Sequence, residues 1–358
     1  MAKNHDLQQY VYVPTRTKDE IGKYQNLSLQ YVDYYYKHIL NKYDRVFYHH
    51  KIKKTFTFIE KELPGDAIDL IHAHFLFSDG GIALNYYKKY KTPYIVAVRN
   101  TDLNLFFKYM IHLRSKGVEI LKNAAKIIFI SHSYQKELLE KYIPKKLKNS
   151  ITDKSIVIPN GIDSFWLENT HSEHSLKTDF IKVLYVGDFS KNKNIQNTIS
   201  ALQLLRNEGI DIRFTIVGGG GDYESKIMNL VNVNKNWIKY IPRTNNKQEL
   251  LKIFRESDLF CMPSIYETFG LVYIEALSQS LPIIYTKGQG IDGYFKEGEV
   301  GYSVNCFIKE DIKAKIIAIL KNYNYISSNC YKLASYFSWN KITNQYINLY
   351  RSIEKQND

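Results

Sequence analysis

The stretch SDLFCMPSIYETFGLVYIEALSQSLPII, Ser257 to Ile284, decides how we expect the chain to fold. It opens with an apolar strand that ends at Pro263, continues through a loop over 264–269, and enters an apolar helical segment near Gly270. A second apolar run, 282–285, follows. A strand, a helix and a strand of these lengths predict a βαβ unit whose two strands lie parallel in one sheet.

The same alternation extends in both directions from this stretch. We expect strands at 10–13, 45–48, 68–72, 94–98, 127–130, 155–158, 182–186, 213–217, 237–240, 259–262 and 282–285. We expect helices at 78–89, 116–123, 134–142, 195–207, 223–232, 247–256 and 271–279, and a helical pattern over 309–355. The alternation predicts an α/β fold with parallel sheets covered on both faces.

The chain has 358 residues, more than one hydrophobic core usually supports. A polar stretch over 168–179 is typical of a linker. We therefore expect two doubly wound, Rossmann-like domains, residues 1–170 and 171–335, followed by a C-terminal helix in 336–358. Ligands of such sheets bind beyond the carboxyl ends of the strands, so two facing domains would form a binding cleft.

Two carboxylates, Glu267 and Glu275, stand in the most apolar segment of the sequence. The helix that begins near Gly270 offers unpaired N–H groups to phosphate oxygens, from Thr268, Phe269, Gly270 and Leu271. Glu267 repels phosphate and suits a neutral hydroxylated group such as a sugar. Glu275 lies about two helical turns further along the predicted helix. The plainer interpretations are a helix-capping acid for Glu267 and a solvated one for Glu275.

A second strand end carries Gly187 and then Lys191 and Lys193 before a predicted helix. A lysine there can neutralise a diphosphate leaving group, although a surface lysine is the plainer interpretation. The run IVGGGGD, 216–222, does not match a dinucleotide fingerprint and is explained by a tight turn.

Together these segments resemble the retaining glycosyltransferases of the GT-B fold, the large group that includes sucrose synthase and many bacterial polysaccharide transferases. The resemblance spans about residues 65–350. It is carried by DLIHAHFLFSDGG (69–81), YIVAVRNTD (94–102), KIIFISHSYQKEL (126–138), VIPNGID (157–163), LYVGDFSKNKNI (184–195), IVGGGG (216–221) and the opening stretch.

The resemblance implies a role for each donor-side residue. Glu267 would contact the hydroxyls of the donor sugar and Glu275 the ribose of a nucleotide diphosphate sugar. Lys193, with Gly187 nearby, and the N–H groups of 268–271 would hold the diphosphate, without a metal or other cofactor.

Three positions or regions depart from the pattern of the group. Asp188 stands where members commonly have a phosphate-binding arginine, and Arg99 where many have a histidine. We expect Arg99 to assist the phosphates or the acceptor, and Asp102 and His74 to lie on the acceptor side, with packing as the plainer role for His74. The chain also starts near the group's second strand, so either the first strand-helix unit is missing or 10–13 has become the first strand.

Composition sets further bounds. The formal net charge is +13, with 26 basic and 18 acidic residues in 1–175. Solvated faces explain this excess most simply; an anionic membrane surface is the alternative, and no nucleic-acid motif accompanies it. No apolar run is long enough to span a membrane, no secretory signal is evident, and the three cysteines have no paired spacing. We expect a cytoplasmic protein, with peripheral binding to the inner face of the plasma membrane as the alternative.

The sequence thus predicts an enzyme that transfers a hexose from a UDP- or GDP-sugar to a glycan or lipid-linked glycan with retention, in bacterial cell-surface polysaccharide synthesis. The alternative is a binding or assembly subunit of the same fold that has lost turnover, as Asp188 and the late start suggest.

Overall fold

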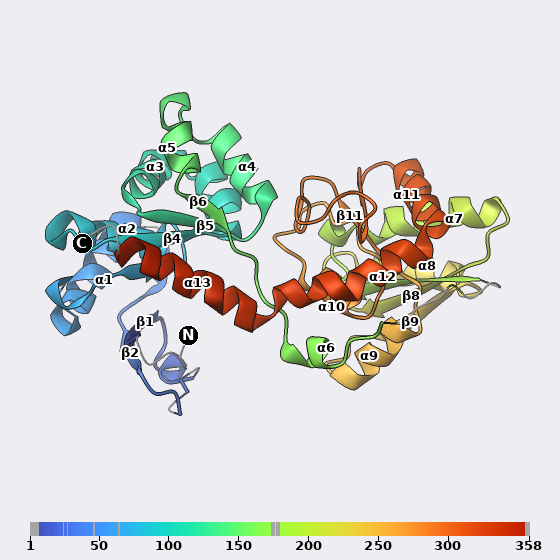
Figure 1. Ribbon diagram of the computed structural model, residues 1–358, viewed down its shortest axis with the longest axis horizontal. Coiled ribbons are helices and arrows are strands. Elements are labelled where there is room, and N and C mark those ends of the chain that lie inside the picture. The colour runs from blue at the N-terminus through green and yellow to red at the C-terminus, as the bar shows by residue number, and fades with distance from the viewer. Residues whose placement is uncertain are drawn as a thin grey trace. The chain divides into compact units, whose positions relative to one another are not determined.

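The computed structural model describes residues 7–23, 25–26, 28–45, 47–63, 65–172, 176 and 180–354. The chain divides into two compact units: residues 1–129, 138–156 and 343–358 form the first, and 130–137 with 157–342 form the second. Much of the expected linker, and the residues ahead of position 7, lie outside the described residues. Figure 1 shows the chain and labels most of its helices and many of its strands.

The second unit contains a six-stranded sheet in the order β12-β11-β10-β7-β8-β9, and every strand pairing in it is parallel. Its strands are β7 (Ile181–Gly187), β8 (Ile212–Gly218), β9 (Ile238–Pro242), β10 (Leu259–Cys261), β11 (Ile283–Thr286) and β12 (Gly301–Val304). The order reverses between β7 and β10. At such a reversal the loops after neighbouring strands diverge and leave room for a ligand.

Helices cover this sheet. They are α6 (Ser164–Glu168), α7 (Ile195–Asn207), α8 (Glu224–Val233), α9 (Lys247–Arg255), α10 (Leu271–Ser278), α11 (Lys309–Lys321) and α12 (Tyr323–Ala334), with short turns η7 (Lys191–Lys193) and η8 (Ser335–Phe337). The residues of β10 and β11 are all buried. Burial along a whole strand is expected where helices cover both faces of a parallel sheet.

The first unit contains two separate groups of strands. β3 (Ile71–Ala73), β4 (Tyr94–Val98), β5 (Lys126–Phe129) and β6 (Ser155–Val157) form one sheet in that order, and β1 (Gln9–Thr15) pairs in parallel with β2 (Val32–His38). The β1 and β2 pair lies apart from β4 and β5 (Figure 1).

The helices of the first unit are α1 (Tyr48–Glu62), α2 (Ser78–Tyr90), α3 (Arg114–Asn123) and α5 (Lys148–Thr152). α4 (His132–Lys141) and α13 (Trp339–Glu354) contain the residues at which the division between the units falls. Short turns are η1 (Lys18–Glu20), η2 (Lys42–Arg45), η3 (Gly65–Ala67), the π-helical η4 (Asp102–Phe107), η5 (Ile111–Leu113) and η6 (Lys145–Leu147).

The α/β class with parallel sheets is confirmed, and most expected elements are present. The strand expected at 45–48 is wrong, because η2 ends at Arg45 and Tyr48 begins α1. Buried Tyr48, Ile52 and Thr55 recur at helical spacing, and this periodicity prevails over a short apolar run. Three further elements, β2, α1 and β12, have no counterpart among those expected from sequence.

Candidate active site

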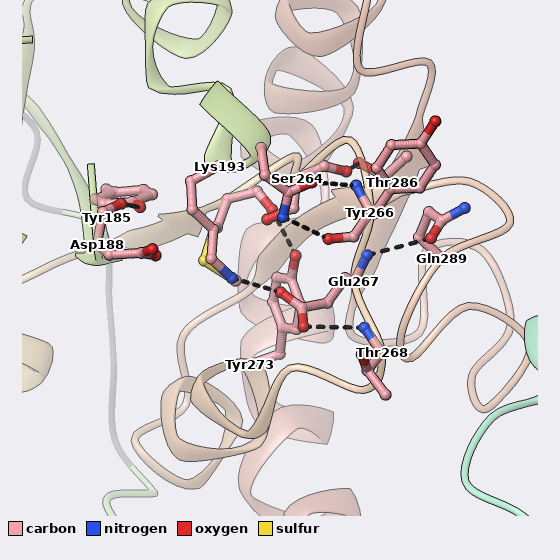
Figure 2. Close-up of polar contacts among 12 residues, drawn as sticks. Tyr185, Asp188, Lys193, Ser264, Tyr266, Glu267, Thr268, Tyr273, Thr286 and Gln289 are labelled. Atoms are coloured by element: carbon pink, nitrogen blue, oxygen red, sulfur yellow. Dashed lines mark hydrogen bonds and ion pairs between the residues drawn. The ribbon is translucent and has the colours of Figure 1, made fainter. Parts of the chain in front are cut away.

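The two predicted donor-side segments of the second unit meet where its strand order reverses. The loop after β7 carries Lys193, and the loop after β10 carries Glu267. Their side chains form an ion pair, with 2.8 Å between Lys193 Nζ and Glu267 Oε2 (Figure 2). The side chains are only 20% and 13% exposed, respectively. A pair this sheltered from water is screened less than a surface pair.

Asn192 fastens the two loops to each other. Its side-chain amide donates to the carbonyl of Tyr266 at 2.8 Å, and its side-chain oxygen accepts from the Tyr266 N–H at 2.9 Å. The carbonyl of Asn192 also accepts from the Ile265 N–H at 2.7 Å. These three bonds hold the loop that carries Glu267 in a fixed position relative to the loop that carries Lys193.

The backbone around Glu267 is held from a third loop, the one after β11. The Glu267 N–H donates to the side-chain oxygen of Gln289 at 3.2 Å, as Figure 2 shows, and its carbonyl accepts from the Gly290 N–H at 2.8 Å. The carboxylate also accepts from the N–H of Thr268 at 3.1 Å. Glu267 is therefore oriented before any ligand arrives.

The start of α10 lies directly beyond this carboxylate. Gly270 precedes the helix with φ +82°, and a Cβ there would meet the ring of Tyr273 at 2.4 Å. Within the described part of the chain, the N–H groups of Phe269, Gly270 and Leu271 have no hydrogen-bond acceptor. Open N–H groups at a helix start attract anions.

Glu275 is a half-buried residue of α10, and the charged residues that act on it are Asp163 and Lys247. Burial, and to a smaller extent the charge of Asp163, raise the pKa of Glu275 to about 7, while Lys247 opposes the shift. Asp163 and Lys247 are themselves ion-paired. The carboxyl group is thus partly protonated near neutral pH.

Asp188 stands next to the site, one residue beyond the end of β7. Its carbonyl accepts a hydrogen bond of 2.7 Å from the hydroxyl of Tyr185, which lies beside Gly187. A Cβ on Gly187 would meet that hydroxyl at 2.7 Å. The absence of a side chain at Gly187 therefore leaves space for the Tyr185 hydroxyl at the end of β7. Burial raises the pKa of the Tyr185 phenol well above its usual value.

The predicted acceptor-side residues lie together in the first unit. Asp102 is 1% exposed and accepts from the N–H groups of Arg99, Leu76 and Phe77 at 2.8, 3.1 and 3.2 Å. Burial raises the pKa of Asp102 to about 6, although these three bonds oppose the shift. Because its carboxylate oxygens accept these backbone N–H groups, Asp102 holds the loop that carries Arg99 in place. Contact between Asp102 and an acceptor stays a prediction.

Arg99 and His74 are in direct contact, since Arg99 Nε donates to the carbonyl of His74 at 3.4 Å. The His74 ring stacks on that of His72, with 4.3 Å between ring centroids. His72 Nδ1 lies 2.7 Å from the hydroxyl of Tyr350 on α13, and burial lowers the pKa of His72 to about 3. His72 thus serves packing, while His74 is exposed.

Sequence reasoning missed the residues that position the carboxylate, above all Asn192 and Gln289. Asn192 lies between Lys191 and Lys193 in the predicted phosphate-binding loop, so its position in the sequence could have indicated a role in the site. Gln289 follows β11, and nothing in its local sequence indicates that it reaches Glu267.

No helix among the described residues is both long and apolar enough to span a membrane. In the same part of the chain, no three histidine, cysteine or acidic side chains are grouped as metal ligands. The three cysteines are free and buried.

Comparison with known proteins agrees with this architecture. The family described as glycosyl transferases group 1 matches residues 168–335, and glycosyltransferase family 4 matches residues 53–164. An uncharacterised glycosyltransferase of Methanocaldococcus jannaschii is 28% identical over 78% of this chain and 74% of its own. A probable sucrose-phosphate synthase of Thermosipho melanesiensis is 26% identical over 86% and 74%.

A capsular polysaccharide biosynthesis glycosyltransferase of Staphylococcus aureus is 27% identical over 58% of this chain and 54% of its own. Among solved structures, sucrose-phosphate synthase from Thermosynechococcus elongatus has a TM-score of 0.70 at 17% identity, covering 97% of this chain and 89% of that one. An Anabaena protein, HepE, solved with UDP and glucose, has a TM-score of 0.63 at 17% identity, covering 90% and 86%.

The two family matches fall on the two Rossmann-like parts in the order of a GT-B enzyme. With its second part matching the group 1 glycosyl transferases and its first part glycosyltransferase family 4, the chain is a glycosyltransferase of the GT-B fold.

Proposed function

We propose that this glycosyltransferase moves a hexose from a nucleotide diphosphate sugar to a glycan or lipid-linked glycan, with retention at the anomeric carbon. The observation that supports this most is the Lys193–Glu267 ion pair beside the open N–H groups of 269–271. Cationic and N–H groups suit a diphosphate, and a carboxylate beside them suits sugar hydroxyls.

Lys193 would stabilise the charge that develops on the leaving diphosphate, together with the N–H groups at the start of α10. When the donor binds, Lys193 would exchange its contact with Glu267 for phosphate oxygens. Glu267, held by Thr268 and Gln289, would then accept hydrogen bonds from the sugar. Glu275 would receive the ribose hydroxyls.

UDP is the better supported nucleotide, since the Anabaena structure was solved with UDP and glucose. GDP-sugars stay in the proposal as a second donor class. The S. aureus relative supports a role in bacterial surface polysaccharide synthesis, and the net charge of +13 favours work at the inner face of an anionic membrane.

Transfer should proceed without a metal ion, since Lys193 and the N–H groups can neutralise the diphosphate. The test is a donor screen by mass spectrometry with and without EDTA, followed by NMR of the product anomer. Turnover that EDTA leaves intact, with an anomer matching the donor, is expected. Loss of turnover in EDTA that Mg²⁺ restores contradicts metal independence, and an inverted anomer contradicts retention.

A binding or assembly subunit is the second candidate, because Asp188 places an acid where a phosphate-binding arginine is common in the group. Calorimetry separates the two. Donor binding without transfer or hydrolysis, across all acceptors offered, favours the subunit.

A further inference from the structure

A row of basic residues follows the strands of the first unit. Arg16 directly follows β1, His74 directly follows β3, and Arg99 directly follows β4. β3 and β4 are paired in parallel, so His74 and Arg99 stand at one sheet edge, where Arg99 Nε donates to the His74 carbonyl. The carboxyl ends of parallel strands are the usual place for ligands.

Lys51 reaches this edge from helix α1. Tyr48, one turn before Lys51, donates its hydroxyl to the carbonyl of Phe77 at 2.9 Å, just ahead of α2. A Cβ on Gly81 in the first turn of α2 would meet the Tyr48 hydroxyl at 2.6 Å and Ile52 Cδ1 at 3.1 Å. Residues three apart share a helix face, so Lys51 also lies against the start of α2.

The charges of Lys51 and Arg16 influence each other. Burial lowers the pKa of Lys51, Asp79 opposes the shift, and the charge of Arg16 lowers the pKa further. The charge of Arg16 therefore acts on Lys51 at the edge formed by β3 and β4, although among the described strands β1 pairs with β2 and not with β3 or β4. Together, Arg16, Lys51, His74 and Arg99 are called the basic cluster below.

The side-chain cations of Arg16, Lys51 and Arg99 form no ion pair with any residue that the structure describes. Among the residues described, no carboxylate oxygen lies within 4.0 Å of the charged nitrogens of Arg16, Lys51 or Arg99. Nη1 of Arg16 is buried with no hydrogen-bond partner. Sheltered cations without partners are costly, and a ligand anion would relieve that cost.

Two acids lie close by and do not cancel the cluster. Asp79, in the first turn of α2, accepts from the hydroxyl of Ser78 at 2.9 Å, and burial raises its pKa. Asp102 is occupied by three backbone N–H groups. The carboxylates of Glu20, which accepts from the backbone N–H of Arg16 at 2.8 Å, and of Asp44, which pairs with Lys54, also lie nearby, yet among the described residues no carboxylate forms an ion pair with the cluster. The N-terminal end of α2 adds positive potential.

We propose that the basic cluster binds a phosphate group carried by the acceptor. Two arginines and a lysine offer several charge-assisted donors, which suits the oxygens of a phosphate. This assignment rests on the proposed function and narrows its acceptor to a phosphorylated glycan or a phospholipid-linked one.

The test is calorimetry with inorganic phosphate at constant ionic strength on the full chain. Lys51→Met keeps most of the apolar stem and Arg16→Gln keeps a polar group, so both preserve much of the packing. Each should weaken phosphate binding about tenfold or more, as expected for the loss of one charge-assisted bond. The matched control is Lys53→Met, at an exposed position on the same helix, which should leave binding unchanged.

Phosphate affinity that is the same in Lys51→Met, Arg16→Gln and the unaltered protein would overturn the site. UDP titration separates the cluster from the donor site: unchanged UDP affinity in both variants is expected, and a parallel loss of UDP affinity would overturn assignment to the acceptor. Lack of turnover with intact, Lys51-dependent phosphate binding speaks against the proposed function alone.

Two further arms identify the source of the phosphate. Glycerol 3-phosphate tests a soluble ester, and vesicles of phosphatidylglycerol, compared with phosphatidylcholine, test a lipid headgroup. A Lys51-dependent response in either arm supports the site and names the acceptor class. No Lys51-dependent response in either arm overturns assignment to a phosphorylated acceptor.

Discussion

In the second unit, Lys193 and Glu267 neutralise each other across 2.8 Å, whereas in the first unit the charged side-chain nitrogens of Lys51 and Arg16 have no carboxylate oxygen within 4.0 Å among the described residues. The first arrangement is complete without a ligand and must exchange partners when one binds. The second is incomplete and gains a partner on binding. The difference teaches that charge balance, more than charge count, separates the two candidate ligand sites of this chain.

The largest expected effect comes from breaking the compensated pair. Glu267→Ala and Lys193→Ala should each lower kcat/KM by about 10²- to 10⁴-fold, because each removes a preorganised charge at the reacting end of the donor. Steady-state kinetics with the best donor measure this. Lys191→Ala, in the same turn but exposed, is the control and should stay within about twofold. Full activity in both variants would refute the assigned roles.

The loop that supports the pair can be disturbed without touching a charge. Gly270→Ala should lower the free energy of unfolding by about 3 kcal/mol, because the new Cβ meets Tyr273 at 2.4 Å in a left-handed backbone. Gly288→Ala is a matched control: its φ is +75°, but nothing lies within 4 Å of the added Cβ. Urea unfolding compares them, and equal losses would show that contact with Tyr273 is unimportant.

Glu275 offers a test that depends on pH. Its pKa is raised to about 7, so the stability gained from its protonated form is full below the ordinary carboxyl pKa and is lost as pH rises through about 7. Glu275→Gln should therefore match the unaltered protein at pH 4 and be more stable by about 2 kcal/mol at pH 8. Denaturant unfolding at both pH values measures this.

The control for that experiment is Glu256→Gln, at an exposed position, which should leave stability nearly unchanged at both pH values. A Glu275→Gln variant with the same small difference at pH 4 and pH 8 would contradict a buried, protonated carboxyl at this position.

The smallest effect compares the same substitution in both regions. Lys193→Met should lower the free energy of unfolding by about 1–2 kcal/mol, because it leaves the Glu267 carboxylate without its partner. Lys51→Met should leave stability unchanged or raise it by up to about 1 kcal/mol, because it removes a sheltered cation that forms no ion pair among the described residues. Thermal or urea unfolding measures both variants, and a change in the free energy of unfolding with the same sign in both would contradict the difference in charge balance between the two regions.

Much of the second unit could be predicted from sequence, because its helices and strands are regular and punctuated by loop residues. α7 has the predicted bounds, and α10 and β10 differ by one residue. The first unit was harder. β2, VDYYYKH, mixes charges and tyrosines, which resembles neither an alternating nor a continuous apolar strand, and the strand predicted at 45–48 precedes a helix.

Some features of the candidate sites could likewise be predicted from sequence and others could not. Lys193, Glu267 and the start of α10 were predictable because each lies between the end of a strand and the helix that follows it. Their mutual ion pair was not, since residues 74 positions apart meet only through the strand order. Arg16 and Lys51 were not predicted as site residues, because what distinguishes their charged groups is that they form no ion pair among the described residues, and a sequence does not show which charges are paired.

The central claim is that Lys193 and its loop hold the diphosphate of a nucleotide sugar, and calorimetric titration with UDP tests it most directly. We expect the unaltered protein to bind UDP in the presence of EDTA, Lys193→Met to bind it at least about tenfold more weakly, and Lys191→Met to bind it as well as the unaltered protein. UDP affinity that is the same in all three proteins, or UDP binding that disappears in EDTA, would contradict the account.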